Sequence, residues 1–364
     1  MNATSRGPLA EMNAQVGSAF SALLERFHVA RGVGRMALLL VVTFTFFAVL
    51  RPGIFLNQVN LQNIGIAAPE IGLLSLAVMI AMLTGGIDLS VVAIANATAI
   101  TISSLYTALE GSRGTAGAES MTVLIVIAGI AVGAALGAIN GVLISVVGIT
   151  PILATLGTMQ VFNGLALVWT GGVTISGAPS ALVSMGRSGI GPVPVLLLIF
   201  LAAACALAVL VNRTPIGRKI QLHGANAEVS RYSGINRRAT LMSTYVTSGL
   251  LAALAGVLFL SRNPSASADY GSSYVLLVIV IVVLGGTNPN GGFATVLGVV
   301  LATLTLQVVS SGFTALRLSA YEYAIAQGVI LIGVMILDQM KFKRRTGGTQ
   351  APLEQQPVSS AITE

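Results

Sequence analysis

Residues 64–109 read IGIAAPEIGLLSLAVMIAMLTGGIDLSVVAIANATAITISSLYTAL, and in this stretch only Glu70 and Asp88 carry a charge. A helix needs about 20 apolar residues to cross the hydrocarbon core of a bilayer. The stretch supplies two such runs, Ile64–Leu83 and Leu89–Leu109, on either side of the polar segment Thr84–Ser90. It therefore predicts two membrane-spanning helices that are separated by a Gly-Gly break.

The whole chain has the composition of a helical membrane protein. Hydrophobic residues make up 55% of its 364 residues, charged residues make up 9%, and the mean hydropathy is +0.89, whereas soluble domains carry about 25% charged residues. The apolar runs are continuous, which excludes the alternating pattern of a membrane β-barrel. Cys205 lies inside an apolar run and is expected to be a buried thiol. The two isolated histidines do not suit a zinc site, and we expect neither a metal nor a cofactor in this chain.

Ten apolar runs are predicted to cross the membrane. They are Met36–Leu50, Ile64–Leu83, Leu89–Leu109, Met121–Ile139, Pro151–Thr170, Val193–Val211, Ala239–Leu260, Ser273–Leu284, Phe293–Ser311 and Tyr321–Leu337. The eighth run is short and continues into Gly285-Gly286, which predicts a broken or re-entrant helix. Residues 34–338 form the predicted transmembrane domain, residues 1–33 precede it as a cytoplasmic segment, and residues 339–364 are predicted to be a disordered cytoplasmic tail.

The basic residues indicate the orientation. Fourteen of the 19 lysines and arginines lie before the first span, in residues 212–238 or after the last span, and the other five fall one each into the remaining loops. Ten spans place the three rich segments on one side, which the positive-inside rule assigns to the cytoplasm together with both termini. The formal charge of +7 is therefore explained by membrane topology, and we expect contact with lipid and no nucleic-acid partner.

Two Gly-Gly breaks occupy matching places in the two halves of the chain. Gly85-Gly86 precedes Asp88, and Gly285-Gly286 precedes Thr287. Intramembrane acids are costly and usually face protein or water, so Asp88 is a candidate pathway or gate residue; it also suits a helix cap, and the two roles are compatible. Paired breaks are typical of transporters with internal repeats, although a pair of ordinary turns explains the spacing equally well.

The fifth predicted span carries polar side chains behind the apolar stretch that begins at Asn140. Thr155, Thr158, Gln160 and Asn163 form this series. Such groups offer hydrogen bonds either to a hydroxylated solute or to a neighbouring helix, and helix packing is the favoured interpretation.

The loop Asn212–Arg238 holds six of the 19 basic residues. Its composition predicts one or two short amphipathic helices punctuated by Gly224 and Gly234. Apolar residues recur through it and indicate that it docks into another surface, with a solvated basic loop as the alternative: Ile216, Ile220, Leu222, Val229 and Ile235.

The chain has no sequence signature of its own energy source. A phosphate-binding loop needs a lysine directly after a glycine, and none of Lys219, Lys341 and Lys343 follows one. We therefore expect a protein without an ATPase site and without catalytic residues. Only Asp88, and Glu70 near the outer end of the second span, qualify as candidate membrane-embedded acids of an ion-coupled carrier, which disfavours an autonomous carrier.

Several motifs together resemble one known family. They are Thr84–Ser90, Asn140-Gly141 with Thr150–Thr158, Thr170-Gly171-Gly172, Thr214–Ile220 with Gly234-Ile235, Ser248–Gly256, and Leu284–Thr287 with Gly291-Gly292. In this order they look like the membrane permease subunits of bacterial ABC importers, in the ribose, xylose and arabinose branch. The likeness runs from about Leu38 to Asp338. It implies an all-α, ten-helix permease of the type II importer kind in the bacterial inner membrane.

The resemblance also implies partners and sites. A second permease chain, identical or different, would complete the channel, a periplasmic binding protein would deliver a monosaccharide or a related polyol or sugar derivative, and two ATPase domains would bind the ATP. The docking candidates are Thr214, Pro215, Ile216, Gly217, Arg218, Lys219, Glu228, Ser233, Gly234 and Ile235. The pathway candidates are Gly85, Gly86, Asp88, Asn140, Thr155, Thr158, Asn163, Gly285, Gly286 and Thr287. A branched-chain amino-acid or autoinducer-2 permease, or an ion-coupled carrier, remains an alternative.

Overall fold

The computed structural model describes residues 31–319, 321–323, 325 and 328–329. The chain divides into two compact units, Met1–Ser319 and Ala320–Glu364, of which the first contains the described helix bundle. Its helices are α2 (Arg31–Leu50), α3 (Pro52–Phe55), α4 (Gln58–Leu83), α5 (Val91–Ser120), α6 (Thr122–Val142), α7 (Pro151–Thr170), α8 (Ser180–Arg187), α9 (Val195–Arg213), α10 (Pro215–Ala225), α11 (Ala227–Tyr232), α12 (Arg237–Arg262), α13 (Tyr274–Leu284) and α14 (Val296–Ala315). A π-helical turn, Leu143–Val147, extends α6.

The structure confirms the all-α fold and nine of the ten predicted spans. Among the described residues, eight helices are long and apolar enough to cross a membrane, and α13 is a ninth, shorter apolar helix. Eleven residues of helix rise about 16 Å, which is about half of the hydrocarbon core. Helix α13 therefore matches the predicted broken span before Gly285. Most of the predicted tenth span, and the predicted tail, lie outside the described residues.

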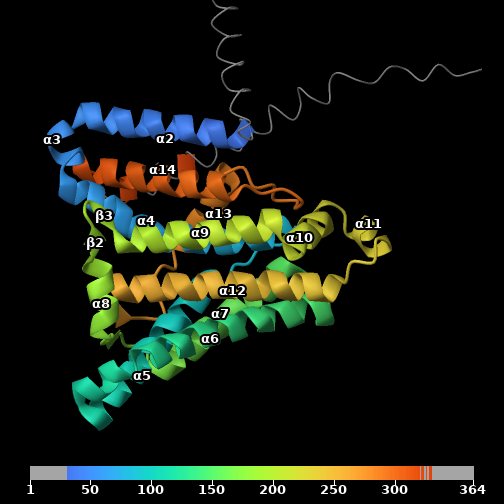
Figure 1. Ribbon diagram of the computed structural model, residues 1–364, viewed down its shortest axis with the longest axis horizontal. Helices are drawn as coiled ribbons and strands as arrows, with labels where there is room; N and C mark the ends of the chain where they lie inside the picture. The colour runs from blue at the N-terminus through green and yellow to red at the C-terminus, as the bar shows by residue number, and fades with distance from the viewer. Residues whose placement is uncertain (1–30, 320, 324, 326–327, 330–364) are drawn as a thin grey trace, which may run out of the picture. The chain divides into compact units, whose positions relative to one another are not determined.

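Helix α4 lies at the centre of the bundle. Every residue from Gly72 to Leu83 is buried, and α4 packs against α9, α12, α13 and α14. A helix that is apolar on all sides can face protein or lipid in a membrane. Helix α4 faces protein, because three long helices and the shorter α13 pack around it (Figure 1).

Helices α6 and α12 approach each other closely through glycines. Gly129, Gly133, Gly137 and Gly141 recur every four residues along one face of α6. A Cβ at Gly137 would lie only 2.9 Å from the Cα of Gly249 on α12, so only hydrogen atoms fit between the two backbones. Small residues permit this kind of contact between membrane helices, where dispersion forces replace the hydrophobic effect.

The outward faces of several helices carry large apolar side chains. Val49 on α2, Val123 on α6 and Val168 on α7 are each more than 70% exposed. Cys205 on α9 is also exposed, which corrects the expectation of a buried thiol. An apolar run indicates only that its side chains avoid water. A side chain that faces lipid or another membrane chain avoids water as well as a buried one does.

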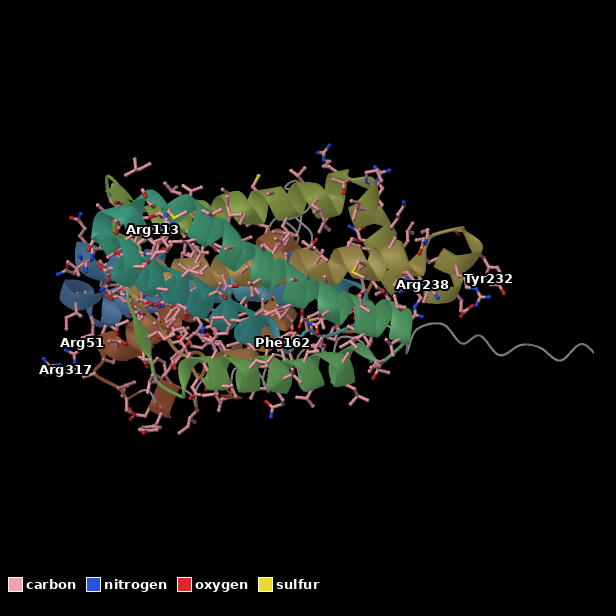
Figure 2. All side chains as sticks on the ribbon, turned by 90° about the horizontal axis from the view of Figure 1, so that it is seen from below. Arg51, Arg113, Phe162, Tyr232, Arg238 and Arg317 are labelled. Carbon is pink, nitrogen blue, oxygen red and sulfur yellow. The ribbon has the colours of Figure 1, made fainter. Side chains whose placement is uncertain are left out.

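The two ends of the helix bundle differ in structure. At one end lie α10 and α11, with Tyr232 and Arg238; at the other lie Arg51, Arg113 and Arg317 (Figure 2). We call these the α10 end and the α8 end. Two short antiparallel strand pairs also occur: β1 (Ile175–Ser176) pairs with β4 (Ser265–Ala266), and β2 (Gly189–Ile190) pairs with β3 (Val193–Pro194).

Candidate functional site

The first Gly-Gly break joins α4 to α5. Gly85 adopts a left-handed φ of 82°, which glycine tolerates because it has no Cβ. A Cβ at Gly86 would lie 2.6 Å from the hydroxyl of Tyr245 and 2.7 Å from the Cβ of Pro151. The first glycine thus allows the turn, and the second allows α7 and α12 to pack closely against it.

Asp88 follows this turn and is completely buried. Its Oδ1 accepts hydrogen bonds from the backbone N–H of Ser90 at 3.0 Å and from the Ser90 hydroxyl at 2.7 Å. Its Oδ2 accepts a hydrogen bond from the hydroxyl of Ser248 on α12 at 2.8 Å. Within the described part of the chain, the Asp88 carboxylate forms no salt bridge. The N-cap residue of α5 is Ser90, without a capping side-chain hydrogen bond, so the predicted cap role of Asp88 is wrong. Asp88 instead holds Ser90 just before α5 and ties it to α12.

The hydrogen bonds continue from Asp88 to two further helices. The Asn140 side-chain amide on α6 donates to the Ser90 hydroxyl at 2.7 Å, and the Thr158 hydroxyl on α7 donates to Asn140 Oδ1 at 2.6 Å. The Thr155 hydroxyl donates to the Ile87 carbonyl at 2.9 Å and accepts from the Leu89 N–H at 3.2 Å. We call Asp88, Ser90, Asn140, Thr155, Thr158 and Ser248 the Asp88 cluster.

The Asp88 cluster is chemically suited to bind hydroxyl groups, but it is closed in this conformation. It combines a carboxylate, an amide and four hydroxyls, and all of its members are buried. Their hydrogen bonds connect α5, α6, α7 and α12, so the cluster holds these helices together. A solute reaches these groups only if the helices separate.

The cluster brings together four of the predicted pathway side chains and omits others. Asn163 is half-buried and lies elsewhere on α7, and no hydrogen bond of the cluster reaches it. Gln160 is exposed, so the predicted polar series does not form a single stripe. Ser248 and Tyr245 were missed as site residues, because several hydroxyl residues precede Ser248 in the same predicted span and nothing in the sequence sets it apart. The Tyr245 hydroxyl is buried beside the first break without a hydrogen-bond partner among the described residues.

The second Gly-Gly break joins α13 to α14. Gly286 has a φ of 87°, and the Gly285 carbonyl accepts a hydrogen bond from the Thr295 hydroxyl at 2.9 Å. Thr287 is buried, and its hydroxyl has no hydrogen-bond partner among the described residues. The two breaks meet, because the Gly292 N–H donates to the Leu83 carbonyl at 3.0 Å.

The loop Asn212–Arg238 forms two helices, as the sequence predicts. The Thr214 hydroxyl accepts a hydrogen bond from the Gly217 N–H at 3.2 Å and so caps α10, and Pro215 is the first residue of the helix. The Asn226 side chain accepts from the Val229 N–H at 3.0 Å and caps α11. Gly224 lies within the last turn of α10, so the break between the helices is at Asn226 and not, as predicted, at Gly224.

Both helices present apolar side chains to the outside. Ile216, Leu222, Val229 and Tyr232 are between 48% and 86% exposed, whereas Ile220 is completely buried. Charged and small residues surround them, all exposed: Arg218, Lys219, Glu228, Arg231, Ser233 and Gly234; Ile235 is half-buried. We call these residues the α10–α11 surface, and Tyr232 lies at its tip (Figure 2). Beneath it, burial and the charge of Arg237 lower the pKa of His223.

A second buried acid, Glu70, lies in the middle of α4. The helix begins at Gln58, six residues before the predicted span, so Glu70 is not near its end as predicted. Its carboxylate pairs with Arg262 at 3.6 Å. The nearby Asn96 amide donates to the carbonyls of Ala268 and Tyr270, at 2.8 Å each. Burial, followed by the charge of Glu70, raises the pKa of Tyr270.

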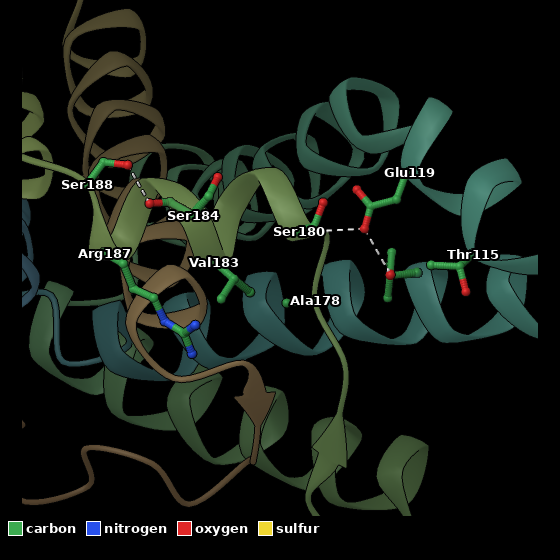
Figure 3. Close-up of a pocket in the computed structure, with 9 residues that line it drawn as sticks. Thr115, Glu119, Ala178, Ser180, Val183, Ser184, Arg187 and Ser188 are labelled. Carbon is green, nitrogen blue, oxygen red and sulfur yellow. Dashed lines mark hydrogen bonds between the residues drawn. The ribbon is translucent and has the colours of Figure 1, made fainter.

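The α8 end carries an open pocket of about 580 Å³ that is lined by both polar and apolar side chains (Figure 3). Glu119 lies on one side, where its carboxylate accepts hydrogen bonds from the Ser180 N–H at 2.7 Å and from the Tyr106 hydroxyl at 3.0 Å. Ser184, Arg187 and Ser188 also line the cavity. None of the predicted pathway or docking residues contributes to it.

Comparison with known proteins decides the family. Residues 60–337 match the family of the permease component of branched-chain amino acid transport systems. The chain belongs to this permease family. The match covers every span from α4 to α14, both Gly-Gly breaks and the α10–α11 surface, and the predicted resemblance is confirmed. No solved structure matches this permease significantly.

Its curated relatives are import permeases. The permease is 34% identical to the ribose import permease protein of Bacillus subtilis over 81% of its own length and 88% of the relative's. It is 30% identical to the D-allose transport system permease protein of Escherichia coli, over 83% and 90% of the two chains. It is 33% identical to an autoinducer 2 import system permease protein of Yersinia enterocolitica, over 73% and 79%.

Proposed function

We propose that this permease is the membrane-spanning subunit of an ATP-driven importer for a monosaccharide or a related polyol or sugar derivative. The names of its relatives include ribose import, galactose/methyl galactoside import and D-allose transport, which supports a sugar substrate. It lies in the bacterial inner membrane as a multi-pass protein with both termini in the cytoplasm. It works with a second permease chain, two cytoplasmic ATPase domains that bind the ATP, and a periplasmic binding protein.

The α10–α11 surface carries this proposal. Four large apolar side chains stand exposed on two helices outside the long spans, among basic residues. Exposed apolar patches with a polar rim are typical of protein interaction sites. The basic residues support a cytoplasmic position for this end by the positive-inside rule, and an ATPase subunit would be available there. The surface therefore suits an ATPase better than it suits solvent or lipid.

The Asp88 cluster and the two breaks form the proposed pathway region. ATP-driven closure of the ATPase pair would push on α10 and α11 and tilt the helices that the cluster holds together. The carboxylate, amide and hydroxyls of Asp88, Asn140, Thr155 and Thr158 would then face the opening and offer hydrogen bonds to sugar hydroxyls. Asn163, Gly285, Gly286 and Thr287 remain candidates along the same route.

Reconstitution tests the proposal. The permease would be placed in liposomes with the ATPase and the binding protein encoded beside it, and uptake of radiolabelled ribose, allose, galactose, autoinducer 2 and leucine would be followed with and without ATP. We expect ATP-dependent uptake of one of the sugars that requires the binding protein. Uptake driven by an ion gradient through the permease alone would refute the proposal, and selective uptake of leucine or autoinducer 2 would replace the sugar.

Charge reversal tests the docking surface. The double variant Arg218→Glu with Lys219→Glu is expected to abolish both uptake and co-purification of the ATPase, because both side chains are exposed on α10. Arg113→Glu at the α8 end is the matched control and should leave both unchanged. Normal assembly and uptake in the double variant would show that the ATPase docks elsewhere.

A further inference from the structure

Gly224 occupies a place where no side chain fits. It lies in the last turn of α10, which is a regular helix there. A Cβ at this position would overlap the carbonyl oxygen of Leu83, the last residue of α4, and would lie 2.7 Å from the N–H nitrogen of Gly292. Both neighbours are backbone atoms, so a rotamer change cannot relieve the overlap.

Three segments that are distant in sequence meet at this point through backbone alone. A Cβ at Gly291 would lie 2.7 Å from the Gly224 carbonyl oxygen and 2.8 Å from the Gly85 nitrogen. A Cβ at Gly292 would lie 2.8 Å from the Cα of Ala225. The hydrogen bond from Gly292 to Leu83 closes the contact between the two breaks. We call Gly85, Gly224, Gly291 and Gly292 the glycine junction.

Two properties make the glycine junction stiff. Gly85, Gly291 and Gly292 adopt φ values of 82°, 92° and 81°, a region that side chains disfavour, so these turns have few alternative conformations. The contacts between the segments are backbone-to-backbone, with no flexible side chain to absorb a displacement. Close-packed interiors transmit strain, and a movement of the end of α10 therefore has to move Leu83 and Gly292.

The glycine junction connects the α10–α11 surface to both broken helices. Leu83 and Gly85 lead within a few residues to Asp88 and the start of α5, and Gly292 leads to α14. We infer that Gly224 is a positioning residue that transmits the displacement of α10 to both breaks at once. This inference rests on the proposed function, because it needs an ATPase that pushes on α10. It assigns to Gly224 the coupling of ATP hydrolysis to transport, as distinct from ATPase docking.

The test compares uptake with ATP hydrolysis in the reconstituted transporter. Gly224→Ala is expected to keep the ATPase bound and hydrolysing ATP, because the exposed docking side chains are unchanged, while the amount of substrate imported per ATP falls roughly tenfold, within the range that coupling residues control. The control is Gly111→Ala on α5, where a Cβ meets nothing within 4 Å. It should keep the normal ratio.

Each outcome distinguishes the inference from the proposed function. A wild-type transporter without ATP-dependent uptake would refute the proposed function. A Gly224→Ala variant with a normal ratio of uptake to hydrolysis, or one that loses the ATPase altogether, would overturn the inference alone. A merely structural glycine would lower both activities together and leave the ratio unchanged.

Hydrogen exchange in the wild-type complex provides a second test of the inference if Gly224→Ala fails to fold. Binding of a non-hydrolysable ATP analogue to the docked ATPase should change the exchange of the Gly292 amide and of residues 84–90. The Arg218→Glu and Lys219→Glu double variant should show no such change. Unchanged exchange at both breaks in a wild-type complex that transports would overturn the inference.

Discussion

The hydrogen bond between Ser248 and Asp88 should contribute measurably to the stability of the permease. The donor and the acceptor are both completely buried, and the oxygen–oxygen distance is 2.8 Å. A hydrogen bond to a charged group contributes about 1.5–3 kcal/mol. Ser248→Ala removes the bond and leaves the carboxylate with two donors, so we expect it to lower the free energy of unfolding by that amount.

A double-mutant cycle separates this bond from other effects of the substitution. In an Asp88→Ala background the Ser248 hydroxyl has no carboxylate to bind and turns to a carbonyl of its own helix, as serine commonly does. Ser248→Ala should then cost less than about 0.5 kcal/mol, which leaves a coupling free energy of about 1–3 kcal/mol.

The assay is reversible unfolding of the purified permease in mixed micelles by titration with sodium dodecyl sulfate. The control is Ser243→Ala on the same helix, since its hydroxyl donates to the nearby Thr240 carbonyl at 2.8 Å and does not contact the cluster. It should change the free energy of unfolding by less than about 0.5 kcal/mol. Equal costs of Ser248→Ala in both backgrounds would refute the assignment of Asp88 as the residue that ties α5 to α12.

Other variants probe the helix packing, the pH response and the buried ion pair. Gly133→Leu should separate α6 from α12 and cost about 1–3 kcal/mol or more, whereas Gly157→Leu on an open face should leave the thermal midpoint unchanged. Burial and the neighbouring guanidinium of Arg237 lower the pKa of His223 below its ordinary value of 6.5. As the pH falls, the His223 side chain therefore takes up a proton in the unfolded chain before it does so in the folded chain, and the free energy of unfolding should decrease below pH 6.5. The variant His223→Gln should lack this pH dependence. Arg262→Gln should lower the thermal midpoint, because it leaves the buried Glu70 carboxylate without its ion-pair partner, and adding Glu70→Gln should restore the midpoint. The free energy of unfolding of Arg262→Gln should fall by about 1 kcal/mol, because Arg262 is 39% exposed and solvent screens the pair.

Hydropathy predicted the helices well and their surroundings poorly. The nine described spans were found because each needs a long apolar run. Yet α4 is buried from Gly72 to Leu83 while Val168 on α7 faces outward, although both segments are apolar. Lipid tails and protein cores are equally apolar, so the pattern cannot distinguish a helix at the centre of the bundle from one at its edge. The wrong expectation for Cys205 has the same cause.

The candidate site was predicted in part, for a geometric reason. Thr155 and Thr158 are three residues apart and share a face of α7, so both reach the Asp88 cluster. Asn163 follows Thr158 by five residues, which turns it by about 140° away from that face. Ser248, which donates a hydrogen bond to Asp88, is 160 residues away in sequence. A local sequence pattern does not predict which distant helix will contact a given residue. The Gly224 contact is a similar case, because the sequence marks the glycine and not its neighbour.

The opposite ends of α13 explain how a short helix can take part in a long-range movement. Tyr274 at its start lies beside Glu70 and Tyr270, and Leu284 at its end leads into Gly285, where a Cβ would lie 2.7 Å from the Val299 nitrogen of α14. The helix is too short to cross the membrane by itself, and it packs along its length against α4 and α14. A displacement that enters at Gly292 therefore acts on α14 directly and on α13 through Gly285. The Glu70 ion pair at the far end of α13 is partly exposed and weaker than the buried Asp88 cluster, so we expect the helices to separate first at the Glu70 site while the cluster still holds α5, α6, α7 and α12 together.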